Sequence, residues 1–285
     1  MASLSMIGME GCLTGIYTAD GEAADGLSTV APKAMARLEH DSPDIVVVAS
    51  DVEKEALIEA AAPHLRPSTR LLVGGYGHYE FRDPMFLEET QNALVPSLAN
   101  GYPGSLIHIF QCLQNASRLG LNGAVAEFGM FRGGTTMLLS RFIERLGQSW
   151  KVYGFDTFSG FPPRRSVLDM YAHPDCVYLD EQAARRYLSE RNVEIVSGDL
   201  VETADRMAGQ PLILAFVDTD NYTPATKVLD VIQDNVLVGG AIVFDHFTGQ
   251  NRFLYTLGER LAAKRLLDDP RYFNLHNTGV FLRQR

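Results

Sequence analysis

The sequence predicts an α/β protein whose main part, about residues 105–285, is a Rossmann-like sheet of mostly parallel strands. Three observations predict this fold. Short apolar runs typical of buried strands alternate with helix-like segments, a glycine-rich turn joins the first strand of this stretch to its first helix, and several strands end on acidic residues. A shorter alternation over residues 1–80 predicts a small N-terminal α/β module. Residues 81–104 are expected to be a linker or a lid.

Composition and charge narrow the class of protein. The chain has 285 residues, 46% hydrophobic and 21% charged, which is typical of soluble globular proteins. Its net charge of −10 argues against a nucleic-acid partner, because binding to phosphate backbones depends on basic surfaces. Neither a signal peptide nor an apolar run long enough to span a membrane is visible. We therefore expect a cytoplasmic protein that binds a small molecule, with a homo-oligomer left open.

The N-terminal module is expected to contain at most three strands. Residues 45–49 form a continuous apolar, β-branched run that suits a buried parallel strand. A helix should follow over residues 51–64, because acidic residues in its first turn suit the helix dipole. The other expected elements are a strand at 70–73, a strand at 13–18 and a helix at 32–40. No glycine-rich turn follows the first strand, so no cofactor site is expected here.

Between the two regions, residues 76–104 are expected to be irregular, because aromatic residues and prolines punctuate them. The segment can be a linker packed across the domain junction or a lid over the substrate.

The main region predicts five parallel strands followed by an antiparallel hairpin. An Asn and a Gly lie between the last two strands and favour a tight turn. This topology is that of class I methyltransferases, whereas dinucleotide-binding sheets more often end on another parallel strand. The expected strands are 124–128, 152–155, 193–196, 213–217, 241–244, 272–275 and 280–283, and the expected helices are 105–119, 135–146, 181–190, 201–207, 224–235 and 252–266.

The glycine-rich turn at residues 129–134 follows the first strand of this region. Glycines there allow a sharp turn and close approach to a ligand, although they also serve simple strand–helix packing. Glu127, at the end of the buried strand, favours the interpretation of this turn as a ligand-binding site. A buried carboxylate is costly without a partner, and an ammonium group is a suitable one.

Two further acids end the next strands. Asp156 can accept hydrogen bonds from ribose hydroxyls, which indicates an adenosine site without naming the cofactor. It can also be a helix N-cap, but the residues that follow it do not resemble a helix start. Asp199 can accept from an adenine amino group, cap a helix, or do both.

Two central strands end on Asp218 and on Asp245-His246, at the sheet edge where ligands bind in open α/β sheets. Two carboxylates and an imidazole can hold a divalent cation, with Mg²⁺ or Mn²⁺ suited to the oxygen ligands. The alternative is that Asp220 and Asp245 cap or brace loops.

Taken together, these motifs resemble the macrocin O-methyltransferase family, which methylates sugar hydroxyls of glycosylated antibiotics. The resemblance covers about residues 104–283. Its pieces are EFGMFRGG at 127–134, YGFDTFSGFP at 153–162, GD at 198–199, VDTDNY at 217–222, VGG at 238–240 and FDHF at 244–247.

The resemblance implies an S-adenosylmethionine-dependent O-methyltransferase with the class I fold. It implies that Glu127 and the 129–134 loop hold the methionine part, Asp156 the ribose and Asp199 the adenine. It also implies a divalent cation on Asp218 and Asp245. The full set of expected cofactor contacts is Glu127, Gly129, Arg132, Gly133, Gly134, Thr135, Asp156, Thr157, Asp199 and Asp218.

His246 departs from the family pattern, which has a second acid there. A neutral imidazole lowers the negative charge that holds Mg²⁺. The metal set of Asp218, Asp245 and His246 can therefore bind metal weakly, prefer a softer ion such as Mn²⁺ or Fe²⁺, or have lost metal. His246 or Asp218 is then the expected general base for a direct methyl transfer to a hydroxyl. Two alternatives stay open: an NAD(P)-dependent oxidoreductase, and a non-catalytic methyltransferase-like protein that binds the cofactor.

Overall fold

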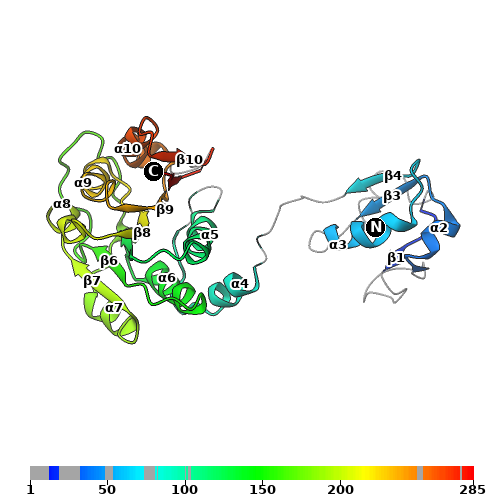
Figure 1. Cartoon of the computed structure of the whole chain (residues 1–285), viewed down its shortest axis with the longest axis horizontal. Coiled ribbons are helices and arrows are strands. Elements are labelled where there is room, and N and C mark those ends of the chain that lie inside the picture. Colours follow the sequence, from blue (N-terminus) through cyan, green and yellow to red (C-terminus); the bar gives the residue numbers. More distant parts are fainter. Residues whose placement is uncertain are drawn as a thin grey trace. The chain divides into compact units, whose positions relative to one another are not determined.

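The structure is a computed structural model that describes residues 13–18, 33–48, 54–73, 81, 83–99, 101, 104–248, 253–276 and 278–285. The chain divides into two compact units, Met1–Glu80 and Phe81–Arg285 (Figure 1). Among the residues it describes, no helix is long and apolar enough to cross a membrane.

The second unit is built on a seven-stranded sheet with the order β10-β11-β9-β8-β5-β6-β7 (Figure 1). The strands from β5 to β9 pair in parallel, whereas β11 pairs antiparallel with both β9 and β10. The predicted class I methyltransferase fold is therefore confirmed. The strands are β5 (Ala124–Phe128), β6 (Val152–Asp156), β7 (Val193–Ser197), β8 (Leu212–Val217), β9 (Val236–Phe244), β10 (Tyr272–Asn274) and β11 (Val280–Arg283).

The helices of this unit lie close to their expected positions, with one addition, α4. They are α4 (Pro84–Gln91), α5 (Ser105–Arg118), α6 (Gly134–Arg145), α7 (Glu181–Tyr187), α8 (Leu200–Thr203), α9 (Tyr222–Ile232) and α10 (Phe253–Ala263). The described residues of this unit also contain three short 3₁₀ helices: η3 (Pro174–Cys176), η4 (Ala204–Met207) and η5 (Lys264–Leu266).

Several expected boundaries are shifted. Helix α7 ends at Tyr187 rather than at residue 190, α9 spans Tyr222–Ile232 rather than 224–235, and the largest shift is in strand β9. Strand β9 begins at Val236, five residues before the expected start, because Gly239 and Gly240 lie within the strand and glycine weakens the strand pattern. Gly240 is needed there, since a Cβ would lie 2.6 Å from the Ile213 carbonyl oxygen. The C-terminal hairpin is also looser than expected, because five residues, 275–279, connect β10 to β11.

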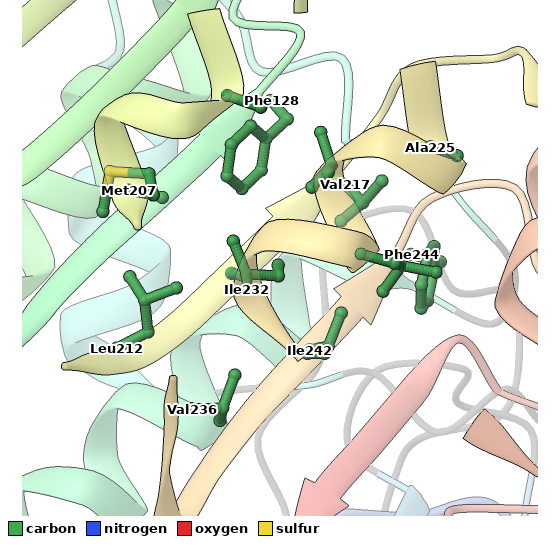
Figure 2. Packing of buried hydrophobic residues seen from close by; sticks show 14 of the residues in the cluster. Phe128, Met207, Leu212, Val217, Ala225, Ile232, Val236, Ile242 and Phe244 are labelled. Carbon is green, nitrogen blue, oxygen red and sulfur yellow. The ribbon is translucent and has the colours of Figure 1, made fainter. Parts of the chain in front are cut away.

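Both faces of the sheet are buried, which explains the near-continuous apolar strands. Alternate residues point to opposite faces. Val125 and Phe216 pack under α5 and α6, while Phe128 and Val217 pack under α8 and α9. Figure 2 shows the second cluster around Phe128, Val217 and Phe244. Glu127 shares the face of Val125 and is a charged residue within an otherwise apolar strand.

Helix α4 corrects the expectation that residues 76–104 are irregular. Asp83 caps it by accepting from the Phe86 amide at 3.1 Å, and Pro84 occupies the first turn. The ring of Phe86 lies 5.5 Å from that of Phe110 and 5.8 Å from that of Phe142. Residues 84–91 are thus part of the core of the second unit.

We expect Phe86→Ala to lower the free energy of unfolding by about 3 kcal/mol, because it removes a buried ring from an aromatic cluster. Urea denaturation followed by tryptophan fluorescence would measure the loss. Leu94→Ala is the control, since Leu94 is 83% exposed and should change stability by less than about 0.5 kcal/mol. Equal stability of the two variants would show that α4 does not contribute to the core.

The N-terminal unit contains four strands in its described residues, as two parallel pairs, so the prediction of at most three strands is wrong. Strand β3 is also less buried than predicted, since Ile45 and Val47 are exposed. Leu38 is the best buried member of a small core that also includes Met35 and Ala61. The expected helix at 32–40 is instead a two-residue strand and a short helix, and the expected strand at 13–18 covers only its last two residues. The elements are β1 (Tyr17–Thr18), β2 (Lys33–Ala34), α2 (Arg37–Asp41), β3 (Ile45–Val48), α3 (Lys54–Ala61), η2 (Ala62–His64) and β4 (Arg70–Val73).

Candidate active site

A cavity of about 350 Å³ opens at the carboxyl ends of strands β5, β6, β8 and β9. This size is within the usual range of small-molecule sites. Of the predicted site residues, only Gly133 does not line it. Those that do are Glu127, Gly129, Arg132, Gly134, Thr135, Asp156, Thr157, Asp199, Asp218, Asp245 and His246.

The glycines of the turn allow close backbone approaches. Gly129 has φ = 104°, and a Cβ there would lie 2.0 Å from the Asp218 carbonyl oxygen. Gly133 has φ = 82° and directly precedes α6. A Cβ on Gly134 would lie 2.3 Å from the Pro96 carbonyl oxygen. Gly129 and Gly134 are therefore needed where other backbone segments pass against the turn, and its role in binding a ligand stays a prediction.

Glu127 is buried at the end of β5 and accepts a hydrogen bond from the Thr136 hydroxyl. Among the described residues, no basic side chain forms an ion pair with it. Burial, together with the nearby Asp156 and Asp245 carboxylates, raises the pKa of Glu127 to about 8. A buried carboxyl group on a cavity wall without a cationic partner fits a ligand that carries an ammonium group.

Asp156 organises the turns on either side of it. Its carboxylate accepts from the Phe131 amide at 2.8 Å and from the Phe158 amide at 3.0 Å. Both phenylalanines have positive φ, 51° and 48°, which directs these amides at the carboxylate. Asp156 is therefore not a helix N-cap, and each oxygen keeps a lone pair for a hydroxyl donor in the cavity.

Asp199 does cap a helix. One of its oxygens accepts from the Val201 amide at 3.0 Å at the start of α8, and the other pairs with Arg165 at 2.7 Å. The N-cap role expected from the sequence is confirmed. The role in binding adenine stays a prediction, and Arg165 would have to share the carboxylate with that group.

The structure brings His246 together with three carboxylates. Its Nε2 lies 3.0 Å from an Asp220 oxygen, 3.4 Å from one of Asp218 and 3.6 Å from one of Asp245. The other Asp245 oxygen accepts from the Ser105 hydroxyl and from the Gly101 amide at 2.9 Å.

Within the described residues, the side chains whose ligand atoms come close enough together for a metal ion are Asp218, Asp220 and His246. Asp220 was considered only as a loop brace in the sequence. It occupies a left-handed turn at φ = 59°, and its carboxylate faces His246. The VDTDNY motif contained this residue, but the distance from Asp220 to His246 depends on how two loops fold.

Charge determines what this cluster can do. Burial alone would lower the pKa of His246, but the surrounding carboxylates raise it to about 12. Burial and the neighbouring Asp245 carboxylate raise the pKa of Asp218. Without another cation, His246 is therefore an imidazolium that neutralises the carboxylates, and a carboxylate is the better proton acceptor.

Glu259, on α10, is a site residue that the sequence did not reveal. It is fully buried, and its carboxylate accepts from the backbone amides of Thr219, Asp220 and His246 at 2.8, 3.0 and 3.0 Å. Burial raises the pKa of Glu259 to about 7. A glutamate in a helix has no sequence signal that distinguishes it from a solvated one.

Comparisons with known proteins identify the family and support the fold. The sequence profile of the family described as Macrocin-O-methyltransferase (TylF) matches residues 89–284. The chain is similar to the solved O-methyltransferase NovP, with a TM-score of 0.53 and 20% identity over 63% of this chain and 78% of that one. It is also similar to CalS11, a calicheamicin methyltransferase, with a TM-score of 0.52 and 21% identity over 74% and 98% of the two chains. No curated protein matches the chain.

The two structural similarities support the fold alone, because the identities are low. The family match covers more than half of the chain and includes every predicted site residue. It contradicts the alternative of an NAD(P)-dependent oxidoreductase, in which Glu127 would also have no role.

Proposed function

The chain belongs to the macrocin O-methyltransferase family, and on this premise we propose that it methylates a hydroxyl group of a small molecule and that this hydroxyl belongs to a sugar of a glycosylated natural product. The observation that carries the proposal is one cavity lined by two chemically distinct groups. Glu127 offers a buried carboxyl group without a cationic partner, and His246 lies among three carboxylates. The first group suits an amino-acid ammonium, and the second suits a hydroxyl that must lose its proton.

The residues present fit S-adenosylmethionine. Glu127 would hold the ammonium group, with Gly129, Arg132, Gly134 and Thr135 around the methionine part. When bound, this cofactor supplies a methyl group on a sulfonium, which needs no further activation. Asp156 and Thr157 would hold the ribose and Asp199 the adenine.

The remaining chemistry concerns the acceptor hydroxyl. A sugar hydroxyl is a weak nucleophile, so it must transfer its proton as it attacks. Asp218 is the proposed general base, because it lines the cavity and its raised pKa suits proton transfer. His246 would balance the charge of the carboxylates, and it becomes an alternative base only after losing its own proton. These side chains would also orient the acceptor, which accounts for much of the rate in a direct displacement.

We further propose that a divalent cation assists, held by Asp218, Asp220 and His246, whose ligand atoms lie close together, and joined by the Asp245 oxygen that faces His246. The oxygen-rich donor set fits Mg²⁺ or Mn²⁺, and the imidazole favours Mn²⁺. Such an ion would act as a Lewis acid that lowers the pKa of the acceptor hydroxyl.

Removal of metal should therefore lower the rate. We expect EDTA to reduce methyl transfer at least about tenfold and Mn²⁺ to restore it better than Mg²⁺, because His246 replaces an oxygen ligand. The measurement is the initial rate of S-adenosylhomocysteine release after chelation and after re-addition of each ion. Full activity in EDTA would show instead that the His246 imidazolium suffices.

The function itself is tested by incubating the purified chain with S-adenosylmethionine and two acceptor panels, glycosylated macrolides and free nucleotide sugars. Mass spectrometry should find a gain of one methyl group on a sugar oxygen. Methylation of catechols alone would contradict the proposed acceptor class but not the reaction. Absence of S-adenosylhomocysteine binding by calorimetry would contradict both.

A further inference from the structure

One carboxylate connects the two loops that carry the candidate catalytic side chains. One loop follows β8 and carries Asp218 and Asp220, and the other follows β9 and carries His246. Glu259 reaches both from α10. Its Oε2 accepts from the Thr219 and Asp220 amides at 2.8 and 3.0 Å, and its Oε1 accepts from the His246 amide at 3.0 Å.

We propose that Glu259 is a positioning residue that sets the distance between Asp220 and His246, and that the reaction depends on it. The role in the reaction rests on the proposed function, whereas the role in holding the loops does not. Glu259 does not line the cavity, so it acts through the backbone of the two loops.

The geometry requires an anchor of this kind. Asp220 has φ = 59°, a left-handed conformation that is unfavourable for a non-glycine residue and persists only when its surroundings hold it. The Asp220 amide points at Glu259, so the same hydrogen bond that stabilises this turn also directs the carboxylate toward His246.

A carboxylate is the side chain that this position needs. Three backbone N–H groups converge on two oxygens, and an ionised carboxylate accepts at both of them. A glutamine has the same shape but only one acceptor oxygen. Its NH₂ group would therefore face a backbone donor, from either the β8 loop or the β9 loop, and that amide would lose its partner.

The structure also supplies internal references for the experiment. The amides of Asp218 and Asp245 lie in the same two loops but donate to strand carbonyls, to Phe128 at 2.9 Å and to Val217 at 3.0 Å. Loss of Glu259 should leave these two amides protected. Ala262→Gly is the matched control variant, because it weakens the same helix while leaving Glu259 and its three backbone hydrogen bonds in place.

The experiment compares amide hydrogen exchange by NMR in the full chain as wild type, Glu259→Gln, Glu259→Ala and Ala262→Gly. We expect the Thr219, Asp220 and His246 amides to exchange at least tenfold faster in Glu259→Ala. In Glu259→Gln we expect the same increase in exchange rate for the Glu259-bonded amides of at least one of the two loops. The exchange rates of the Asp218 and Asp245 amides should stay within threefold of the wild-type rates in both Glu259 variants. In Ala262→Gly, the three Glu259-bonded amides should exchange no faster than the two reference amides do.

Kinetics complete the test. The kcat for methyl transfer should fall at least tenfold in both Glu259 variants, while the dissociation constant for S-adenosylhomocysteine changes less than threefold. Unchanged exchange of the three amides in Glu259→Ala would overturn the proposal, and so would faster exchange with an unchanged kcat. If the wild type methylates none of the acceptors, the proposed function fails, and the exchange data still decide whether Glu259 holds the loops.

Discussion

Replacing Asp218 by asparagine is expected to lower the kcat for methyl transfer by about 10²–10⁴-fold, the usual contribution of a general base. Asparagine keeps the shape of the side chain at the end of β8. It cannot take up the proton of the hydroxyl that is methylated, and it cannot balance the charge of the His246 imidazolium. Affinity for S-adenosylhomocysteine should fall at most about tenfold, the equivalent of one hydrogen bond. Steady-state rates with a methylated acceptor and calorimetric titration of S-adenosylhomocysteine measure the two effects.

Thermal stability distinguishes this loss of activity from misfolding. Burial raises the pKa of Asp218, and repulsion from the Asp245 and Asp220 carboxylates raises it further. Removal of its charge relieves that repulsion, so the melting temperature of Asp218→Asn should equal or exceed that of the wild type. Asp205→Asn is the control, because Asp205 is an exposed acid paired with Lys227 and should change neither quantity. A kcat within threefold of the wild type would rule out Asp218 as the base.

The second large effect is expected at Glu127, where affinity for the cofactor product should depend on pH. The pKa of this carboxyl is about 8 in the free protein against an ordinary value of 4.5, so it holds a proton at neutral pH. An ammonium ligand favours the ionised form, and binding must then release that proton. The association constant should rise with pH, by up to about tenfold per unit, until it levels near pH 8.

Glu127→Gln should remove this dependence and weaken S-adenosylhomocysteine binding by about 10–100-fold, the loss of one charge-assisted hydrogen bond of about 1.5–3 kcal/mol. Calorimetry in two buffers with different ionisation enthalpies would count the released protons. Glu144→Gln, at an exposed carboxylate paired with Arg191, is the control that should keep the pH dependence. Affinity that does not vary between pH 6 and 8 in the wild type would contradict the assignment of Glu127.

The same shift affects the unliganded fold. A carboxyl group whose pKa is raised on folding stabilises the protein fully below its unfolded value of 4.5, and that stabilisation is lost as the pH rises through about 8. A ligand with an ammonium group should offset the loss. Stabilisation by S-adenosylhomocysteine should accordingly be larger at pH 8 than at pH 6.

Local sequence was enough to predict the main sheet, because its strands are buried on both faces and appear as continuous apolar runs. Acids at strand ends predicted the edge where the site lies, since parallel strands end at a common edge. For the same reason Glu127, Asp156 and Asp218 could be named without coordinates, and the structure places all three on one cavity.

Contacts between distant segments could not be predicted in the same way. Ser105 donates to Asp245 across 140 residues of sequence, and Glu259 reaches Thr219 across 40. Helix α4 was missed although Asp83 and Pro84 are local helix-start signals, because aromatic residues and prolines surround them; the packing of Phe86 against Phe110 and Phe142 fixes the helix in the core.

By itself, the sequence determined the fold class, the family motifs and the strand ends that carry the acids, because each depends on neighbouring residues or on strand order. Only the tertiary structure decided that Asp220 joins Asp218 around His246 and that Glu259 holds both of their loops. The physical reason is that a backbone amide in a loop can pair with any acceptor the packing brings near. Here the acceptor is Glu259, which comes from α10 and not from the loops themselves, so the loop residues alone could not reveal it.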